Sequence, residues 1–157
     1  YLWSQLADDR LHASIIADGF HLPAEVIHVF KKVKNEKLIL VSDSVSLAGM
    51  PPGDYDLHIG GQVTLTTAGK LHLRNNPSIF AGSANHIKHG VSFLIKNNLA
   101  TLAEAWEMAS VRPQKLIHPD HRPFQAGSTA DLLMIENHNS DLNVIKTIKS
   151  GKVVYAA

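Results

Sequence analysis

The first part of the chain alternates between two aliphatic runs and one amphipathic stretch. Residues 11–17 and 38–42 are largely aliphatic, which is typical of strands buried on both faces, as in a parallel sheet. Between these runs, Pro23 suits the first turn of a helix. The apolar residues of the amphipathic stretch recur at helical spacing: Val26, Ile27, Phe30 and Val33. The pattern predicts a strand, a helix and a parallel strand over residues 11–43, after a short helix within residues 1–10.

Further along the chain, alternating apolar and polar positions replace the aliphatic runs. Residues 60–67 and 71–73 alternate on either side of a turn at Gly69, which predicts an antiparallel β-hairpin. We expect this hairpin to form an excursion over residues 57–75. A helix should follow, with Ser83 as its N-cap and with apolar residues on one face: Ile87, Val91, Leu94 and Ile95.

The last third of the chain predicts two more helices and then strands. Thr101 and Glu104 form a capping box that opens a helix through Met108, and we expect Pro113 to mark the end of that helix. A short helical stretch follows near Leu116. The expected strands of the tail lie within residues 125–135, 144–148 and 153–155, with a turn at Ser150-Gly151.

Two polar segments follow the predicted parallel strands. Residues 18–21 (Asp-Gly-Phe-His) come after the first strand, and Asp43 comes after the second. Ligands bind at the carboxyl ends of parallel strands, and neighbouring strands are about 4.8 Å apart, so both segments could contact one small ligand. Position alone leaves a second interpretation open. Asp43 could cap the next turn, Asp18 could form a turn, and Gly19 could serve only for its backbone freedom.

The composition is that of a globular chain without a strong charge bias. The 157 residues are 45% hydrophobic and 18% charged, with a formal net charge of +1. No basic run is dense enough to favour nucleic acid or a membrane surface, and Lys31, Lys32 and Lys34 are expected on the solvated side of a helix. The absence of cysteine excludes a thiolate nucleophile and fits the cytoplasm. Because the chain begins with Tyr1 rather than Met, we expect it to be a piece of a longer protein.

Several short motifs, spread over almost the whole chain, form a recognisable set. They are residues 17–21 (Ala-Asp-Gly-Phe-His), 40–44 (Leu-Val-Ser-Asp-Ser), 48–50 (Ala-Gly-Met), 81–83 (Ala-Gly-Ser), 130–132 (Ala-Asp-Leu) and 151–154 (Gly-Lys-Val-Val). Together they resemble the C-terminal half of the N-acetylglucosamine-6-phosphate deacetylase family, within the amidohydrolase superfamily. The first three motifs narrow the resemblance to this family, whereas the tail is common to the superfamily. Ser42 and Ser44 replace the Thr and Ala of many family members, which leaves the exact substrate less secure.

The resemblance implies an α/β fold, the C-terminal part of a (β/α)8 TIM-type barrel with part of a small β-sandwich. Residues 11–17 would supply the seventh barrel strand and residues 38–42 the eighth. We therefore expect residues 1–122 to belong to the barrel and residues 123–157 to be the C-terminal strands of the sandwich domain.

The resemblance also implies roles for individual residues. Asp43 matches the catalytic Asp, which takes a proton from the attacking water and returns it to the leaving amine. His21 matches a His that contacts the sugar phosphate. The other matched substrate-binding positions are Asp18, Gly19, Phe20, Phe80, Ala81 and Gly82. The family's divalent metal, zinc or iron, is held by a Glu and two His on earlier strands, so we expect no metal ligand in this chain.

The expected function is hydrolysis of N-acetylglucosamine 6-phosphate to glucosamine 6-phosphate and acetate, by a cytoplasmic homodimer. Its partner would be a small amino-sugar phosphate, with neither nucleic acid nor membrane involved. The chain alone should bind no metal and be inactive. Two alternatives remain: another amidohydrolase, dihydroorotase-like or dipeptidase-like, and a sugar-binding or structural module without catalysis.

Overall fold

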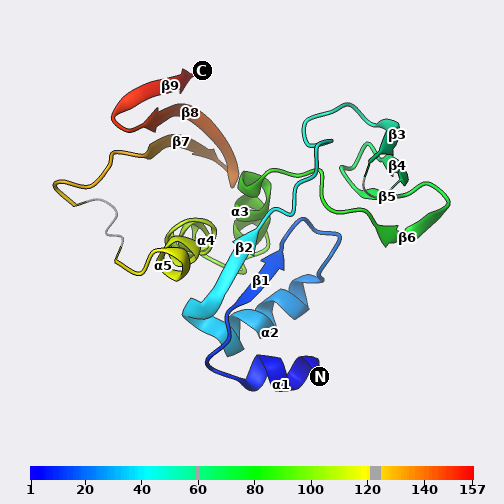
Figure 1. Cartoon of the computed structure of the whole chain (residues 1–157), viewed down its shortest axis with the longest axis horizontal. Coiled ribbons are helices and arrows are strands. Elements are labelled where there is room, and N and C mark those ends of the chain that lie inside the picture. Colours follow the sequence, from blue (N-terminus) through cyan, green and yellow to red (C-terminus); the bar gives the residue numbers. More distant parts are fainter. Residues whose placement is uncertain (59–60, 121–124) are drawn as a thin grey trace.

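The computed structural model of the chain describes residues 1–58, 61–120 and 125–157. Figure 1 shows three β-sheets. At the centre, two parallel strands lie against helices. A four-stranded antiparallel sheet extends to one side of this centre, and a three-stranded antiparallel sheet lies towards the C-terminus. The chain is therefore an α/β protein with two antiparallel additions.

The central part begins with the strand–helix–strand unit that the sequence predicts. Its elements are α1 (Leu2–Ala7), β1 (Ala13–Ile16), α2 (Ala24–Lys34), the 3-10 helix η1 (Asn35–Lys37) and β2 (Leu38–Val41). β1 and β2 pair in parallel, with Ile16 opposite Val41 at their carboxyl ends. Both polar segments therefore leave the sheet at the same edge, which confirms this part of the prediction.

The main hydrophobic core lies between the parallel strands and the helices that cover them. Ile15, Leu38 and Leu40 of the strands are each at most 2% exposed. Fully buried residues of the helices complete this core: Ile27, Val91, Leu94, Ala105 and Met108. This packing fixes the two strand ends relative to each other.

Lys34 does not lie on the solvated side of α2, so that expectation is wrong. Its side chain is buried, and Nζ donates hydrogen bonds to the backbone oxygens of Gln5 at 2.9 Å and Asp8 at 2.7 Å. These carbonyls lie at the C-terminal end of α1, where a helix leaves its last oxygens without partners. Lys32, in contrast, is exposed. Lys34 therefore joins α1 to α2.

The excursion is a four-stranded meander rather than a single hairpin. Its strands are β3 (Gly53–Leu57), β4 (Gly61–Leu65), β5 (Leu71–Leu73) and β6 (Asn76–Phe80), in that order. The expected hairpin is confirmed as β4 and β5, although its first residue, Gly60, lies outside the described residues. β3 and β6 extend the sheet beyond 57–75, and the sequence obscured them because Asp, Gly and Pro are rare in strands. A small core forms on this sheet from Leu47, Val63, Leu65 and Leu71.

Three helices follow, and two of their ends differ from the prediction. α3 (Ile87–Lys96) has His86 as its N-cap, so Ser83 is not the cap. The capping box of α4 (Leu102–Ala109) is confirmed, since Thr101 Oγ1 accepts from the Glu104 N–H at 3.2 Å. Pro113 lies inside the first turn of α5 (Val111–Ile117), where a missing N–H is tolerated, and does not mark the end of α4.

The tail forms an antiparallel meander, as predicted. It comprises β7 (Leu132–His138), β8 (Asp141–Lys149) and β9 (Lys152–Ala156), with the turn at Ser150-Gly151 between the last two. Leu142 of β8 is 1% exposed and joins the main core, and Lys88 of α3 donates to its carbonyl at 3.3 Å. The expected domain boundary between residues 122 and 123 lies outside the described residues.

None of the helices in the described residues is long and apolar enough to cross a membrane.

Candidate functional site

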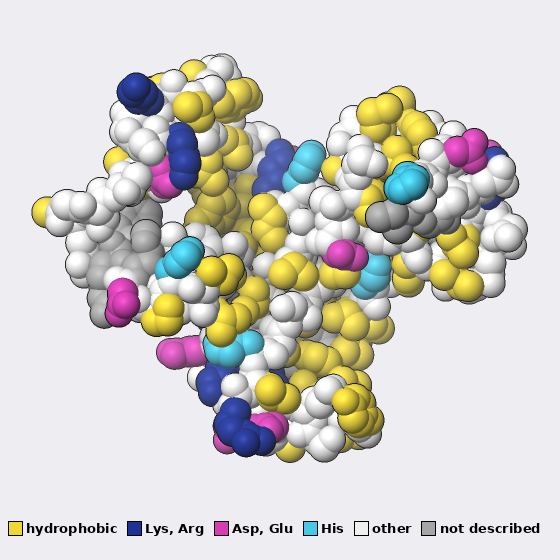
Figure 2. Space-filling view, viewed as in Figure 1, with side chains coloured by type: hydrophobic (Ala, Val, Ile, Leu, Met, Phe, Trp, Pro, Cys, Tyr) yellow, Lys and Arg dark blue, Asp and Glu magenta, His cyan; other side chains and the backbone are white. Residues whose placement is uncertain are grey.

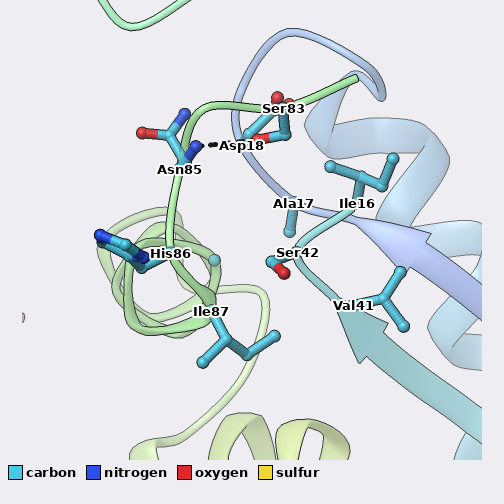
Figure 3. Close-up of a pocket in the computed structure, with 10 residues that line it drawn as sticks. Ile16, Ala17, Asp18, Val41, Ser42, Ser83, Asn85, His86 and Ile87 are labelled. Atoms are coloured by element: carbon cyan, nitrogen blue, oxygen red, sulfur yellow. Dashed lines mark hydrogen bonds between the residues drawn. The ribbon is translucent and has the colours of Figure 1, made fainter. Parts of the chain in front are cut away.

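A small pocket opens at the carboxyl ends of β1 and β2, between these ends and the start of α3 (Figure 3). The two strand ends contribute Asp18 and Ser42, and the segment before α3 contributes Ser83 and His86. The remaining lining residues are Ile16, Ala17, Val41, Asn85, Ile87 and Gly90. The pocket therefore occupies the edge at which the sequence predicts ligand binding. His86 was not predicted, because a single His before a helix carries no distinguishing signal.

The segment after β1 is organised around the carboxylate of Asp18. Asp18 is 6% exposed, and its Oδ1 accepts from the backbone N–H groups of Phe20 at 2.9 Å and His21 at 3.0 Å. Its Oδ2 lies 2.8 Å from His21 Nδ1. A carboxylate accepts hydrogen bonds, so Nδ1 of His21 carries the hydrogen and donates it to Asp18. Asp18 thus fixes both the turn and the orientation of His21.

The same contacts hold Asp18 in its charged form. Burial acts to raise the pKa of this carboxyl, but the His21 and Phe20 backbone N–H groups and the His21 ring outweigh it, so the pKa lies below its ordinary value. A buried carboxylate with three donors is a stable acceptor. Asp18 is therefore suited to orienting the loop rather than to exchanging protons.

Gly19 and its neighbour α3 lie close together. The φ of Gly19 is +83°, and a Cβ on this residue would lie 3.0 Å from Phe93 Cε2. Both the backbone conformation and the approach of the Phe93 ring favour glycine here. These contacts support one of the two interpretations that the sequence left open, namely that Gly19 is required for its backbone conformation.

The antiparallel sheet reaches the site through Phe80, at the end of β6. The rings of His21 and Phe80 are 4.5 Å apart between centroids and inclined by 33°. Lys70, from the turn between β4 and β5, places Nζ 5.0 Å from the Phe80 ring centroid and donates to the Pro77 carbonyl at 3.0 Å. The structure therefore places a lysine and His21, the expected phosphate-contacting residue, against the same Phe80 ring. Sequence reasoning missed Lys70, because a lone lysine in a hairpin turn is ordinary.

Asp43 lies in a sharp, exposed turn directly after β2. Its φ is +48°, which is uncommon for a residue other than glycine. Its carbonyl accepts from the Ser83 N–H at 3.1 Å, and the Ser83 carbonyl accepts from the Val45 N–H at 2.9 Å. Gly82 lies against the same turn, since a Cβ there would be 3.8 Å from Asp43 Oδ2. The structure thus places Asp43 beside Gly82 and Ser83.

The described residues do not provide a metal centre. Within residues 1–58, 61–120 and 125–157, no three His, Asp or Glu side chains come together as ligands for an ion. Asp18 is already satisfied by three donors, which leaves it poorly suited to a cation. A metal at this edge would require ligands from outside these residues.

Comparison with curated proteins gives a consistent set of relatives, although no protein-family model matches the sequence. The N-acetylglucosamine-6-phosphate deacetylase of Haemophilus influenzae is 27% identical over 147 residues, covering 92% of this chain and 37% of that protein. The N-acetylgalactosamine-6-phosphate deacetylase of Escherichia coli O157:H7 is 30% identical over 120 residues, covering 73% of this chain and 29% of that protein. The chain thus spans about a third of the length of these relatives.

Solved structures give the same result. The N-acetylglucosamine-6-phosphate deacetylase of Pasteurella multocida matches 97% of this chain with a TM-score of 0.84 and 28% identity, over 38% of its own chain. The enzyme of the same name from Thermotoga maritima matches 98% of this chain with a TM-score of 0.83 and 28% identity, over 41% of its own chain. The arrangement of strands and helices around the pocket therefore has close counterparts.

Proposed function

We propose that this chain, which is related in sequence and fold to the N-acetylglucosamine-6-phosphate deacetylases, carries the catalytic aspartate and part of the sugar site of such an enzyme. The reaction is hydrolysis of N-acetylglucosamine 6-phosphate to glucosamine 6-phosphate and acetate. The observation that carries the proposal is the parallel pairing of β1 with β2. It brings Asp43 and the Asp18–His21 loop to one edge, beside the pocket.

Asp43 is the proton carrier of the proposed reaction. Its carboxylate takes a proton from water as the water oxygen bonds to the acetamide carbon. It then gives this proton to the sugar nitrogen as the carbon–nitrogen bond breaks, so that an amine and not an amide anion leaves. The exposure of Asp43 and its turn beside the pocket support this role, since a carboxylate that shuttles protons must be accessible.

The loop after β1 and the end of β6 hold the sugar phosphate. His21 is oriented by Asp18 through Nδ1, so Nε2 remains to contact the phosphate. Lys70 adds a positive charge beside Phe80. The remaining proposed substrate contacts are Gly19, Phe20, Ala81 and Gly82. Asp18 contributes by fixing the loop.

The proposal also requires a complete barrel, a bound metal and a partner subunit, which other parts of the protein must supply. We place residues 1–122 in the C-terminal part of a (β/α)8 barrel and residues 123–157 in a small β-sandwich. A divalent cation, zinc or iron, would be bound by residues outside this chain and would lower the pKa of the attacking water. A homodimer is supported by the exposed apolar side chains of β9, and a cytoplasmic location by the absence of cysteine.

Substitution of Asp43 tests the proposal in a complete enzyme that contains this chain. Asp43→Asn removes the proton carrier while keeping the shape of the side chain, so kcat for acetate release should fall by about 10²–10⁴ with little change in KM. Asp56→Asn, at an exposed position of β3, is the matched control. This chain alone, with zinc added, should release no acetate. Undiminished turnover by Asp43→Asn would end the proposal.

A second substrate is favoured by a specific finding. A relative named for N-acetylgalactosamine 6-phosphate is as similar to this chain as those named for the glucosamine compound. The two sugars differ only in the configuration at one hydroxyl group, away from the acetamide and the phosphate. Comparing kcat/KM for both sugar phosphates, with a dihydroorotate and a dipeptide in the same panel, distinguishes these alternatives.

A further inference from the structure

We infer that Gly82 is a positioning residue for Asp43, and that its lack of a side chain sets the conformation of the turn that presents this carboxylate. The inference deepens the proposed function and rests on Asp43 acting in catalysis. The sequence resemblance places Gly82 among substrate contacts. The structure assigns it a further role that depends on contacts within the chain.

The first observation is the strained backbone of the turn. Asp43 has a φ of +48°, a conformation that costs free energy in a residue with a Cβ and persists only when neighbouring groups hold it. Residues on both sides of the turn are held by Ser83. Its N–H donates to the Asp43 carbonyl at 3.1 Å, and its carbonyl accepts from the Val45 N–H at 2.9 Å.

The second observation is how these two segments are joined. Ser44 and Ser83 form a parallel β-bridge, and the Ser44 hydroxyl donates to the Asn85 carbonyl. Ser83 is 2% exposed, and its Oγ accepts from the Asn85 N–H at 3.1 Å. Ser83 is thus anchored, and any shift of the neighbouring Gly82 backbone would be transmitted to Asp43.

The third observation is the space around Gly82. Its φ is +85°, and an added Cβ would lie 2.7 Å from Val45 Cγ1 and 3.4 Å from the Asp43 carbonyl oxygen. Real Cβ atoms do not approach other heavy atoms to 2.7 Å, so either the Val45 side chain or one of the two backbone segments would have to move. Both neighbours belong to the turn that carries Asp43. A side chain at position 82 therefore displaces the carboxylate even where it does not touch the substrate.

A pair of substitutions tests the inference in the complete enzyme. Gly82→Ala should lower kcat by about 100-fold with KM changed less than about threefold, because a misplaced proton carrier impairs turnover more than binding. Val45→Ala removes the Cγ1 atom that the new Cβ would meet. The double variant Gly82→Ala/Val45→Ala should therefore recover at least about tenfold of the lost kcat, relative to Gly82→Ala.

Gly151→Ala is the matched control. Gly151 has a φ of +76°, yet an added Cβ there would have nothing within 4 Å, so this variant carries the conformational strain without the contact. Its kcat should equal that of the unaltered enzyme. If Gly82→Ala fails to fold while the double variant folds and turns over, the same rescue has been observed.

Three results would overturn the inference. They are an unchanged kcat in Gly82→Ala, a rise in KM without a fall in kcat, and a loss that Val45→Ala does not relieve. These results differ from a failure of the proposed function, which Asp43→Asn reports separately. If the Asp43→Asn variant still turns over, Asp43 is not the proton carrier, whatever the effect of substitutions at position 82.

Discussion

At the scale of single residues, Asp18 should make stability depend on pH. Its pKa lies below the ordinary value of 3.8 in the folded chain, because backbone N–H groups and His21 stabilise the carboxylate against the cost of burial. The unfolded chain therefore binds a proton more readily. The stabilisation is complete above about pH 4 and is lost as the pH falls through the lower, folded pKa.

Denaturant unfolding of the full chain between pH 3 and pH 6 measures this effect. The unaltered chain should lose free energy of unfolding below about pH 4 more steeply than Asp18→Asn, whose amide does not titrate. Asp56→Asn, which replaces an exposed carboxylate, should keep the steep slope. Parallel curves for the unaltered chain and Asp18→Asn would contradict the assignment.

Position in the sequence singles out candidate site residues only where they follow a strand. Asp43 and the Asp18–His21 segment stand directly after aliphatic runs, so the rule that ligands bind at strand ends makes them candidates, whereas Phe80, Ala81 and Gly82 became candidates only through the family resemblance. Lys70 and His86 have no such position in the sequence. Their approach to the site depends on how the meander and α3 fold back, which long-range packing decides. The contact between Gly82 and Val45 is likewise visible only in three dimensions.

At the scale of elements, α1 should depend on a single buried lysine. Lys34→Met keeps the length of the side chain but removes the donor that joins the carbonyls of Gln5 and Asp8 to α2, leaving them only the backbone N–H groups of Asp8 and Leu11. The loss of these hydrogen bonds should lower the free energy of unfolding by about 1–3 kcal/mol and speed hydrogen exchange of the α1 backbone N–H groups. Lys32→Met, on the exposed side of the same helix, should change stability by less than about 0.5 kcal/mol.

Hydrogen exchange of the backbone N–H groups of α1, with denaturant unfolding, measures both variants. Faster exchange in α1 confined to Lys34→Met is the expected result. Equal stability of the two variants would show that α1 is held by its apolar contacts alone, since Leu6 is also buried.

Elements with a strong period were predictable, and elements with mixed signals were not. The two parallel strands, α2, α4 and the tail meander follow from aliphatic runs, helical spacing and alternation. β6 contains Pro77 and Asn76, which argue against a strand, yet it pairs at the edge of the meander, where proline is tolerated. Lys34 is a lysine like Lys31 and Lys32, so the sequence does not distinguish it from them. Only the position of α1 in the fold shows that Lys34 is the buried one.

At the scale of the whole molecule, the three-stranded sheet leaves apolar side chains uncovered. Figure 2 shows hydrophobic atoms over the lobe that carries β7, β8 and β9. Val153, Val154 and Tyr155 of β9 are 57%, 62% and 51% exposed, and Met134 of β7 is 54% exposed. Exposed apolar surface of this kind promotes association, so the chain alone should form species heavier than its 17.2 kDa monomer.

Light scattering on the purified chain checks this prediction. Val154→Lys adds a charge to an edge strand and should shift the mass distribution towards the monomer. Lys152→Gln, at an exposed position of the same strand, should leave association unchanged or strengthen it slightly. A monodisperse monomer of the unaltered chain would refute it. The sequence indicated apolar strands but not which of them remain uncovered, because that depends on how the strands pack in three dimensions.

The bridge between Ser44 and Ser83 has a consequence for how this fold can diverge. The chain departs for the meander at Val45 and returns at Ser83, and a hydrogen bond of 2.9 Å links these two points. The meander is thus attached to the rest of the chain through two adjoining ends. Descendants of such a gene could change the length of β3 and β4, away from these ends, while the turn that carries Asp43 keeps its place.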